Sequence, residues 1–364
     1  MTVVSKSVAG SGRGAGPGVG SGTGAKPGPR RAPARRTAAV MVVTLLLLFV
    51  AAVAGLGFGS NPIAPPVVIE AIFSYDPSNN DHLVIVQSRL PRIVLGIIVG
   101  AALGLAGALM QSVTRNPLAD PGILGINAGA SLFVVIAMSL FGITTPRGYI
   151  WFAFLGAAVA AVVVYLLGTA RGNAASPVRI ALAGTAVSIV LGALTQMVVL
   201  SNEAAFNTFR FWSIGSLQSR GFDVIATVVP FVLVGIAFAL LLAGPLNAIA
   251  LGDDVAASLG TRILSTRIAA ALAVVLLAGA ATAAAGPIGF IGLGAAHIAR
   301  FASGNEHHRL LPAATIIGAT LLVTADTLGR FITAPSELQT GIAAALFGGP
   351  LFVALVRSRK VSAL

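Results

Sequence analysis

The chain alternates between long apolar runs and short stretches rich in charges, glycine and proline. An α-helix needs about 20 apolar residues to cross ~30 Å of hydrocarbon. Ten runs approach this length, at 37–58, 93–113, 126–141, 150–169, 180–200, 224–243, 268–285, 288–301, 310–329 and 338–356. The eighth is short and follows Gly286-Pro287, so a re-entrant segment is the alternative there. The pattern predicts an all-α polytopic membrane protein.

The amino-acid composition also indicates a membrane protein. Hydrophobic residues make up 56% of the chain and charged residues 9%, against ~25% charged in soluble domains. A soluble protein with this composition would expose large apolar patches, which lipid would cover here. Cysteine is absent, which excludes disulfides, zinc–thiolate sites and iron–sulfur clusters.

Residues 1–36 form a separate region. They hold seven Lys or Arg and no acidic residue, in a background of Gly, Ala, Pro and Ser. Such a segment buries too little apolar surface to offset its ordering entropy. We expect a disordered basic tail at 1–36, followed by a transmembrane domain at 37–364. The run 37–58 is longer than the apolar region of a signal peptide, which predicts a span that is not cleaved.

The basic residues predict the topology. Lys and Arg concentrate on the cytoplasmic side of membrane proteins, and both the tail and the C-terminal end are basic. If both termini are cytoplasmic, the chain crosses the membrane an even number of times, which favours ten spans over nine. Seventeen of the 23 basic residues then lie inside, so topology explains the net charge of +12 and no nucleic-acid partner is expected. Six arginines remain outside: Arg89, Arg92, Arg147, Arg210, Arg220 and Arg330.

Several of these outer charges begin or end a predicted span. Arg89 and Arg92 flank the start of the second, where the helix dipole disfavours cations. They are either interfacial arginines with snorkelling side chains or a docking site for carboxylates of an outside partner. Asp326 and Arg330 have the i, i+4 spacing of an intrahelical pair. Glu337 opens the last span, where a carboxylate suits the dipole.

Two inner segments carry local signals. Asn116, Pro117, Pro121 and Gly122 predict a structural loop, either an ordinary turn or irregular backbone packed against protein or a cavity. The segment 246–262 predicts a short amphipathic helix, with Leu251, Val255 and Leu259 on one side, Asp253 and Asp254 after Gly252, and Gly260 at its end. We expect its exposed face to be acidic and small and to bind a protein partner, because anionic lipid would repel it.

The remaining candidate residues do not suggest a metal site or a catalytic site. Three of the four histidines lie in 286–309, but adjacent His307 and His308 point about 100° apart on a helix, and no acidic cluster joins them. We therefore predict no metal site, no catalytic residue and no enzyme activity. Small residues on the second and fifth spans either line a pore or pack helices closely: Gly100, Gly104, Gly107, Gly184 and Gly192.

Five ordered motifs make the chain resemble the FecCD-type permeases, which import ferric siderophores, haem and cobalamin. They are RLPR at 89–92, RNPLADPGILG at 115–125, LGDDVAASLG at 251–260, GPIGFIGL with HIAR at 286–300, and ADTLGRF with PSELQTGI at 325–342. GGPLFVALV at 348–356 also fits. The chain departs from the family at Ala296, which stands where a Pro precedes the histidine, and at Gln339-Thr340, where the family has Pro-Val.

The resemblance implies a permease of about ten helices in a bacterial plasma membrane, working with a second permease subunit, identical or paralogous. Two cytoplasmic ATP-binding cassette subunits would bind ATP, so this chain needs no cofactor, and an external binding protein would deliver the chelate. The docking residues implied are Arg89, Arg92 and Arg330. The ATPase-coupling residues implied are Leu251, Gly252, Asp253, Asp254, Val255 and Leu259, and the cytoplasmic gate comprises Ala175, Ser176, Pro177 and Val178.

The expected cargo is a ferric siderophore, with cobalamin or haem as alternatives. An ion-coupled secondary transporter is the rival of another class, but such proteins place ionisable groups at mid-membrane. No predicted span here has a charge at its centre. A membrane metalloenzyme is the weaker rival, because the histidines are scattered.

Overall fold

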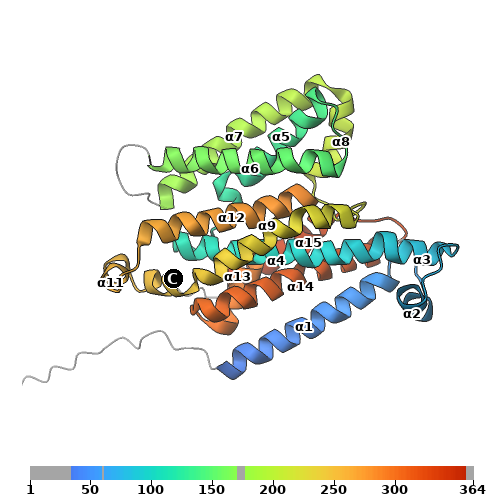
Figure 1. The fold of residues 1–364 in the computed structure, drawn as a ribbon, viewed down its shortest axis with the longest axis horizontal. Helices are drawn as coiled ribbons and strands as arrows, with labels where there is room; N and C mark the ends of the chain where they lie inside the picture. The colour runs from blue at the N-terminus through green and yellow to red at the C-terminus, as the bar shows by residue number, and fades with distance from the viewer. Residues whose placement is uncertain (1–33, 60, 170–176, 358–364) are drawn as a thin grey trace, which may run out of the picture. The chain divides into compact units, whose positions relative to one another are not determined.

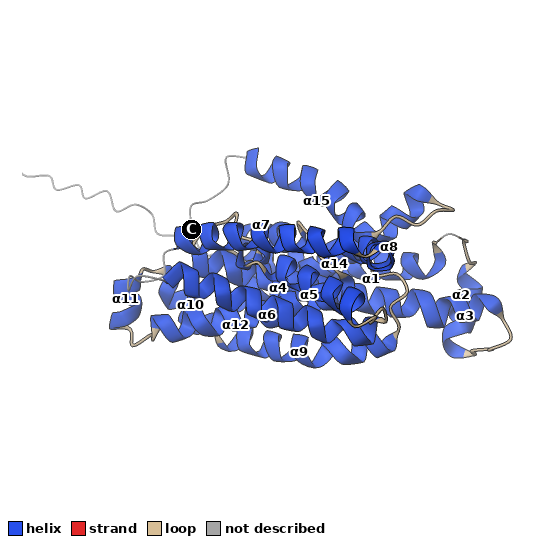
Figure 2. Cartoon of the chain, turned by 90° about the horizontal axis from the view of Figure 1, so that it is seen from above, coloured by secondary structure: helices blue, strands red, loops and turns tan. Residues whose placement is uncertain are grey.

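The computed structural model describes residues 34–59, 61–169 and 177–357. It divides the chain into two units, 1–30 and 31–364, and all of the described residues belong to the second. Over these residues, all regular secondary structure is helical (Figure 2). This confirms the predicted all-α fold. The predicted tail lies almost wholly outside the described residues.

Every predicted span corresponds to a helix (Figure 1). The helices are α1 (Ala34–Gly57), α4 (Leu90–Thr114), α5 (Ile126–Leu140), α6 (Pro146–Thr169), α7 (Pro177–Ser201), α9 (Phe222–Leu241), α12 (Ile263–Ala285), α13 (Ile291–Ser303), α14 (His307–Thr333) and α15 (Thr340–Arg357). The tail prediction was wrong for residues 34–36, which form the first turn of α1 because helical residues continue without a break into its apolar run.

These helices differ in length. Seven helical segments of the described chain are long and apolar enough to cross a membrane, and α5 and α15 are shorter apolar helices. Helix α13 has 13 residues, or about 20 Å at 1.5 Å per residue. The non-helical segment 286–290 precedes it. Gly286 and Ile288 in this segment are buried, as irregular backbone at membrane depth requires.

Helix α4 is the centre of the main helix group. It packs against α9, α12, α13 and α14. A Cβ atom added at Gly100 or Gly104 would overlap the backbone of α14, and one added at Gly107 would overlap Gly292 of α13. These glycines therefore permit close helix packing, and the same holds for Gly184, which faces the carbonyl of Ile123. Gly192 differs, because no atom lies within 4 Å of a Cβ placed there.

Helices α5, α6 and α7 pack on one another and join the main group through α6 and α12. Helix α1 packs along α14. In each of the helices α1 and α7, only 17% of the apolar stretch is buried inside the protein. Their exposed side chains are mainly large and hydrophobic, among them Leu46, Phe49, Leu182 and Ile189. Surfaces of this kind are normally covered by lipid or another subunit.

Short helices that the apolar pattern does not reveal lie between the spans. Helices α2 (Pro65–Phe73), α3 (Asn80–Val84) and α8 (Glu203–Ser213) lie at one end of the bundle, and α10 (Ala243–Ala250) and α11 (Asp253–Ser258) lie at the other (Figure 1). The start of α1 and the end of α15 both point toward the α11 end (Figure 1). An even number of crossings agrees with this, while the cytoplasmic orientation of the termini stays a prediction.

Candidate functional site

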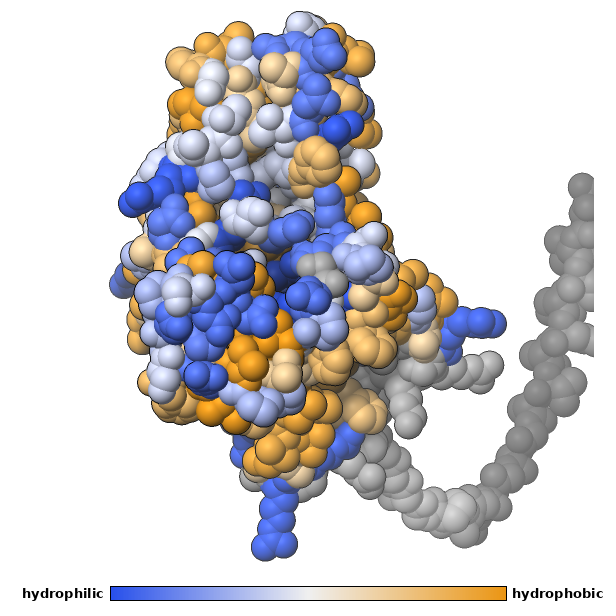
Figure 3. Space-filling view, turned by 90° about the vertical axis from the view of Figure 1, so that its right-hand side faces the viewer, coloured by the Kyte–Doolittle hydropathy of each residue, from blue (hydrophilic) through white to orange (hydrophobic). Residues whose placement is uncertain are grey.

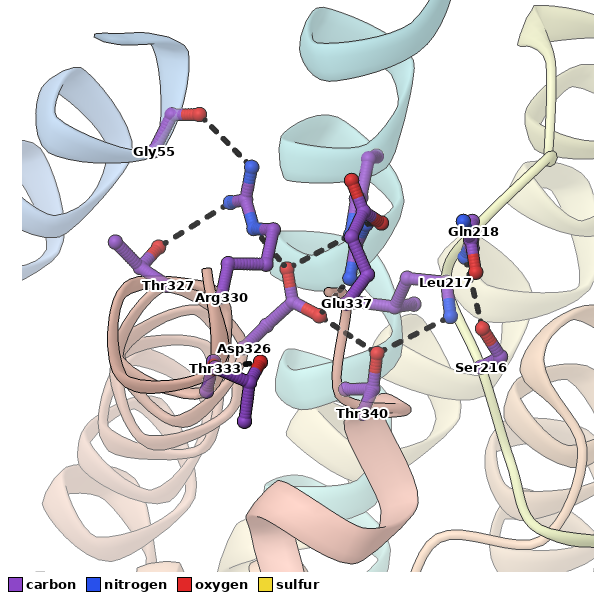
Figure 4. Close-up of polar contacts among 12 residues, drawn as sticks. Gly55, Ser216, Leu217, Gln218, Asp326, Thr327, Arg330, Thr333, Glu337 and Thr340 are labelled. Atoms are coloured by element: carbon purple, nitrogen blue, oxygen red, sulfur yellow. Dashed lines mark hydrogen bonds and ion pairs between the residues drawn. The ribbon is translucent and has the colours of Figure 1, made fainter. Parts of the chain in front are cut away.

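Four charged side chains meet in a buried network at the α2–α3 end (Figure 4). Arg92, near the start of α4, holds Asp326 of α14 through two bonds, Nε–Oδ2 and Nη2–Oδ1, each 2.9 Å long. Its Nη1 donates to Glu337 Oε2 at 2.6 Å. Arg330 Nε lies 3.3 Å from Asp326 Oδ2, which confirms the predicted i, i+4 pair. The side chains of Arg92 and Asp326 are only 6% and 4% exposed.

The carbonyl groups at the end of α1 accept hydrogen bonds from two arginines, Arg330 and Arg89. Arg330 Nη1 donates to the carbonyls of Gly55 and Phe58 at 3.0 and 3.2 Å. Arg89 donates through Nη1 to the carbonyls of Leu56 and Gly57 at 2.6 and 2.8 Å, and through Nη2 to that of Asn61. The last carbonyls of a helix lack partners within it and carry its negative dipole end. Cations therefore suit this position.

Thr340, the first residue of α15, extends the network. Its hydroxyl donates to Asp326 Oδ1 at 2.6 Å and accepts from the backbone N–H of Leu217 at 3.2 Å. The N–H of Gly341 donates to Gly215 at 2.9 Å. A charged cluster thus joins α1, α4, α14 and α15 to the 214–218 loop (Figure 4).

The structure brings Arg89, Arg92 and Arg330 to one end, as predicted, but buries them. Their exposed fractions are 5%, 5% and 2%. The carboxylates of Asp326 and Glu337 lie within this cluster, and Asp81 on α3 acts electrostatically on Arg89. Glu337 does not open the last helix, which begins at Thr340; it bonds to Arg92 instead. Sequence reasoning missed the Arg92–Asp326 and Arg92–Glu337 pairs, and no local signal joins residues more than 230 positions apart.

Figure 3 looks onto this end of the bundle. Hydrophilic residues gather across its middle, and hydrophobic residues border them. The amphipathic helix α8 lies here, and Asn202 caps its start by accepting from the N–H of Ala205 at 3.0 Å. This polar surface lies at the same end of the bundle as the buried arginines.

Helix α11 at the opposite end confirms the predicted short helix after Gly252. Gly252 and Gly260 flank it with φ values of 116° and 78°, which favour glycine at both positions. The turn from α10 into α11 is closed by the N–H of Gly252, which donates to the Ile249 carbonyl at 3.1 Å. These two glycines set the direction in which α11 projects from the bundle.

The exposed residues of this helix include acidic and small ones, as predicted, among them Asp254, Ala257 and Ser258, but its apolar side is exposed as well. Leu251, Val255 and Leu259 are 63%, 44% and 64% exposed. Asp254 is exposed, but Asp253 turns to the bundle, where it accepts from Arg115 Nη2 at 2.5 Å and Arg267 Nη2 at 3.0 Å. The two arginines attract the carboxylate, so the apolar side of the helix is left outermost. We name Leu251, Val255 and Leu259 the apolar trio.

The loop between α4 and α5 has the predicted turn chemistry. Asn116 Oδ1 accepts from the N–H of Leu118 at 2.9 Å, and Asp120 Oδ1 accepts from that of Gly122 at 2.8 Å. Asp120 caps a 3₁₀ turn, η2 (Pro121–Leu124). Burial raises the pKa of the Asp120 carboxyl above its ordinary value, and the Gly122 bond offsets part of this rise. The loop packs against α7, so it is irregular backbone supported by protein.

The predicted gate is described only in part. Ala175 and Ser176 lie outside the described residues. Pro177 is the first residue of α7, and Val178 after it is 66% exposed.

Comparisons with known proteins agree with this architecture. The family model described as "FecCD transport family" matches residues 45–358. The ferric enterobactin transport system permease protein FepD of Escherichia coli (strain K12) is 43% identical over 89% of this chain and 96% of its own length. The Fe(3+)-citrate import system permease protein YfmD of Bacillus subtilis (strain 168) is 38% identical over 90% and 98%. A solved inward-facing metal-chelate type ABC transporter has a TM-score of 0.77 and 28% identity, covering 88% of this chain and 99% of that chain.

Proposed function

This chain belongs to the FecCD transport family, and from that premise we propose that it is the permease subunit of an ATP-driven importer for ferric siderophore complexes. The observation that carries the proposal is the similarity to the ferric enterobactin permease over nearly the full length of both chains. The similarity to the ferric citrate permease supports the same class of cargo, an iron(III) chelate. The chain is a transport component of a cell membrane.

ATP binding and hydrolysis are assigned to two separate cassette subunits. The apolar trio on α11 is the contact surface we propose for one of them, because exposed apolar side chains on a short projecting helix suit insertion into a groove of a partner. Asp253 contributes indirectly, since its bonds to Arg115 and Arg267 hold α11 against α4 and α12. Movement of the cassettes would then be passed to these two helices. This chain itself would need no cofactor.

A binding protein would dock at the opposite, outer end. The positively charged groups of the buried cluster, Arg89, Arg92 and Arg330, would attract carboxylates of that protein. Glu337 is the more exposed acid of the cluster, with 23% of its side chain accessible against 4% for Asp326. We propose that a partner carboxylate replaces Glu337 on Arg92 Nη1. Docking would thereby loosen the link between α4 and the segment before α15.

A second permease subunit would cover part of the exposed apolar surface, and lipid the rest. The chelate would pass between the two subunits, and the segment Ala175–Val178 would form the cytoplasmic gate. The rival, an ion-coupled secondary transporter, needs ionisable groups in mid-membrane. Asp326 instead lies in a closed network at the outer end of α14, beside the last carbonyls of α1.

Reconstitution tests the proposal. The chain would be co-expressed with a cassette ATPase and a binding protein and placed in proteoliposomes. We expect ATP-dependent uptake of iron-55 as a ferric siderophore, with ATPase activity stimulated by the loaded binding protein. Ferric citrate, haem and cobalamin serve as parallel cargoes. Uptake that follows a proton or sodium gradient without ATP would refute the importer assignment, and stimulation by cobalamin alone would refute the cargo.

A further inference from the structure

A polar cavity of about 240 Å³ lies at the α11 end of the bundle. It lies where the end of α4, the α10–α11 turn, α13 and the start of α14 meet. Its lining residues are Ser112, Arg115, Ala250, Leu251, Gly252, Arg300, Asn305 and His307. Two of them are cationic and three more carry polar side chains, in contrast to the apolar helix contacts of the core.

Arg300 in this cavity has no acidic partner among the described residues. It donates through Nε to Gln111 Oε1 at 3.2 Å, through Nη1 to Asn305 Oδ1 at 3.4 Å and through Nη2 to Ser112 Oγ at 2.9 Å. All three acceptors are neutral. A guanidinium group has five N–H donors, so two remain after these bonds. A partly buried cation without a counter-charge favours an anion beside it.

The second lining arginine supplies further hydrogen-bond donors. Arg115 Nη2 donates to the Ile249 carbonyl at 2.6 Å and to Asp253 at 2.5 Å. Both bonds come from one nitrogen, which leaves the rest of its donor fork available. Asp253 is shared with Arg267. Arg267 does not line the cavity. Of the two lining arginines, Arg115 is paired with Asp253 and Arg300 bonds to neutral groups, so the site carries one positive charge in excess.

The neutral lining residues are held in place by bonds of their own. Asn247 Oδ1 accepts from both the backbone N–H and the Nδ1–H of His307, each at 2.8 Å. The other ring nitrogen, Nε2, lies 2.8 Å from Ser112 Oγ. Asn305 uses its oxygen for Arg300, so its amide N–H₂ remains as a further donor. The cavity thus combines two guanidinium forks with a side-chain amide.

We propose that this cavity binds a phosphate group, supplied either as free inorganic phosphate or as the headgroup of an anionic lipid. A tetrahedral oxyanion can accept from two guanidinium forks and an amide at once. The occupant would lie beside Leu251 and Gly252 and would bridge α4, α13 and the α10–α11 turn. The proposal does not depend on the identity of the transported chelate, because none of the lining residues is assigned to the cargo.

Phosphate binding by the full-length chain tests the proposal. The purified chain in neutral detergent would be titrated with inorganic phosphate by calorimetry, at ionic strength held constant with chloride. In a parallel arm, the chain in nanodiscs with or without phosphatidylglycerol would be examined for retained lipid by native mass spectrometry. The variants are Arg300→Gln and Asn305→Asp. Arg147→Gln, which changes a 72% exposed arginine at the other end, is the matched control.

Asn305→Asp is the more informative variant. It places a carboxylate next to Arg300 with almost no change in side-chain shape, so we expect the variant to fold. We expect saturable binding in at least one arm, reduced at least about tenfold by either variant and unchanged by Arg147→Gln. Binding in the first arm identifies free phosphate, and binding in the second alone identifies a lipid headgroup. Absence of binding in both arms, or equal binding by folded Asn305→Asp, overturns the proposal.

Discussion

Replacement of Asp326 by asparagine removes the carboxylate at the centre of the outer charged network. The wild-type side chain accepts from two nitrogens of Arg92 and from Thr340, at 2.6 to 2.9 Å, and forms an ion pair with Arg330 at 3.3 Å. Asparagine keeps one oxygen but turns an N–H₂ group toward an arginine. Two buried guanidinium groups would then share only Glu337. Loss of one partner from a buried ion pair costs about 3–5 kcal/mol, and exposure of 4% leaves little screening by water.

Unfolding of the purified variant in detergent measures this cost. Asp223→Asn is the matched control, because Asp223 makes an exposed pair with Arg147 at 3.8 Å, and exposed pairs contribute about 0–1 kcal/mol. We expect Asp326→Asn to lower the midpoint of unfolding clearly more than the control does. Arg330→Met added to Asp326→Asn should restore part of the loss, because it removes a buried cation that has lost its carboxylate partner Asp326. Equal midpoints for the two single variants would refute the reasoning.

Three further predictions concern the other elements. Val255→Asp should abolish coupled ATPase activity and uptake in the reconstituted complex while the chain stays folded, whereas Ser258→Asp on the same helix should retain them; normal uptake with Val255→Asp would contradict the role of the apolar trio. Glu337→Gln adds one positive charge to the outer cluster and should strengthen binding of the external protein at low salt, measured by surface plasmon resonance against Arg147→Gln; unchanged affinity would contradict docking there. Gly104→Val should destabilise the chain by more than about 3 kcal/mol by pushing α4 from α14, while Gly192→Ala, with open space around it, should leave the unfolding midpoint unchanged.

The sequence was most informative where one physical requirement controls a long segment. Hydrocarbon thickness fixes the length of an apolar run, so each of the ten predicted spans corresponds to a helix. Helix α11 was predictable because two glycines at positive φ flank it. Helices α2, α3 and α8 were missed because short amphipathic segments outside the bilayer carry no comparable constraint.

The side-chain partners were less predictable for a different reason. Arg92 and Asp326 are 234 positions apart, and only the packing of α4 against α14 brings them together. The contacts of Asp253 were also not predicted, because Arg115 and Arg267 come from other parts of the chain. Spacing along the chain predicts pairs such as Asp326–Arg330, but it contains no information on such distant partners.

One continuous helical segment of 35 residues runs from Asn80 through the π-helical turn at Ile85–Arg89 to Thr114. At 1.5 Å per residue it is about 50 Å long, well beyond the ~30 Å of the hydrocarbon core. Its outer part carries Arg89 and Arg92, and its other end carries Gln111 and Ser112, next to Arg115. A rigid rod of this kind transmits a tilt or rotation applied at one end to the other without any relay of small rearrangements. This segment thus connects the charged network at one end of the bundle directly to the polar cavity at the other.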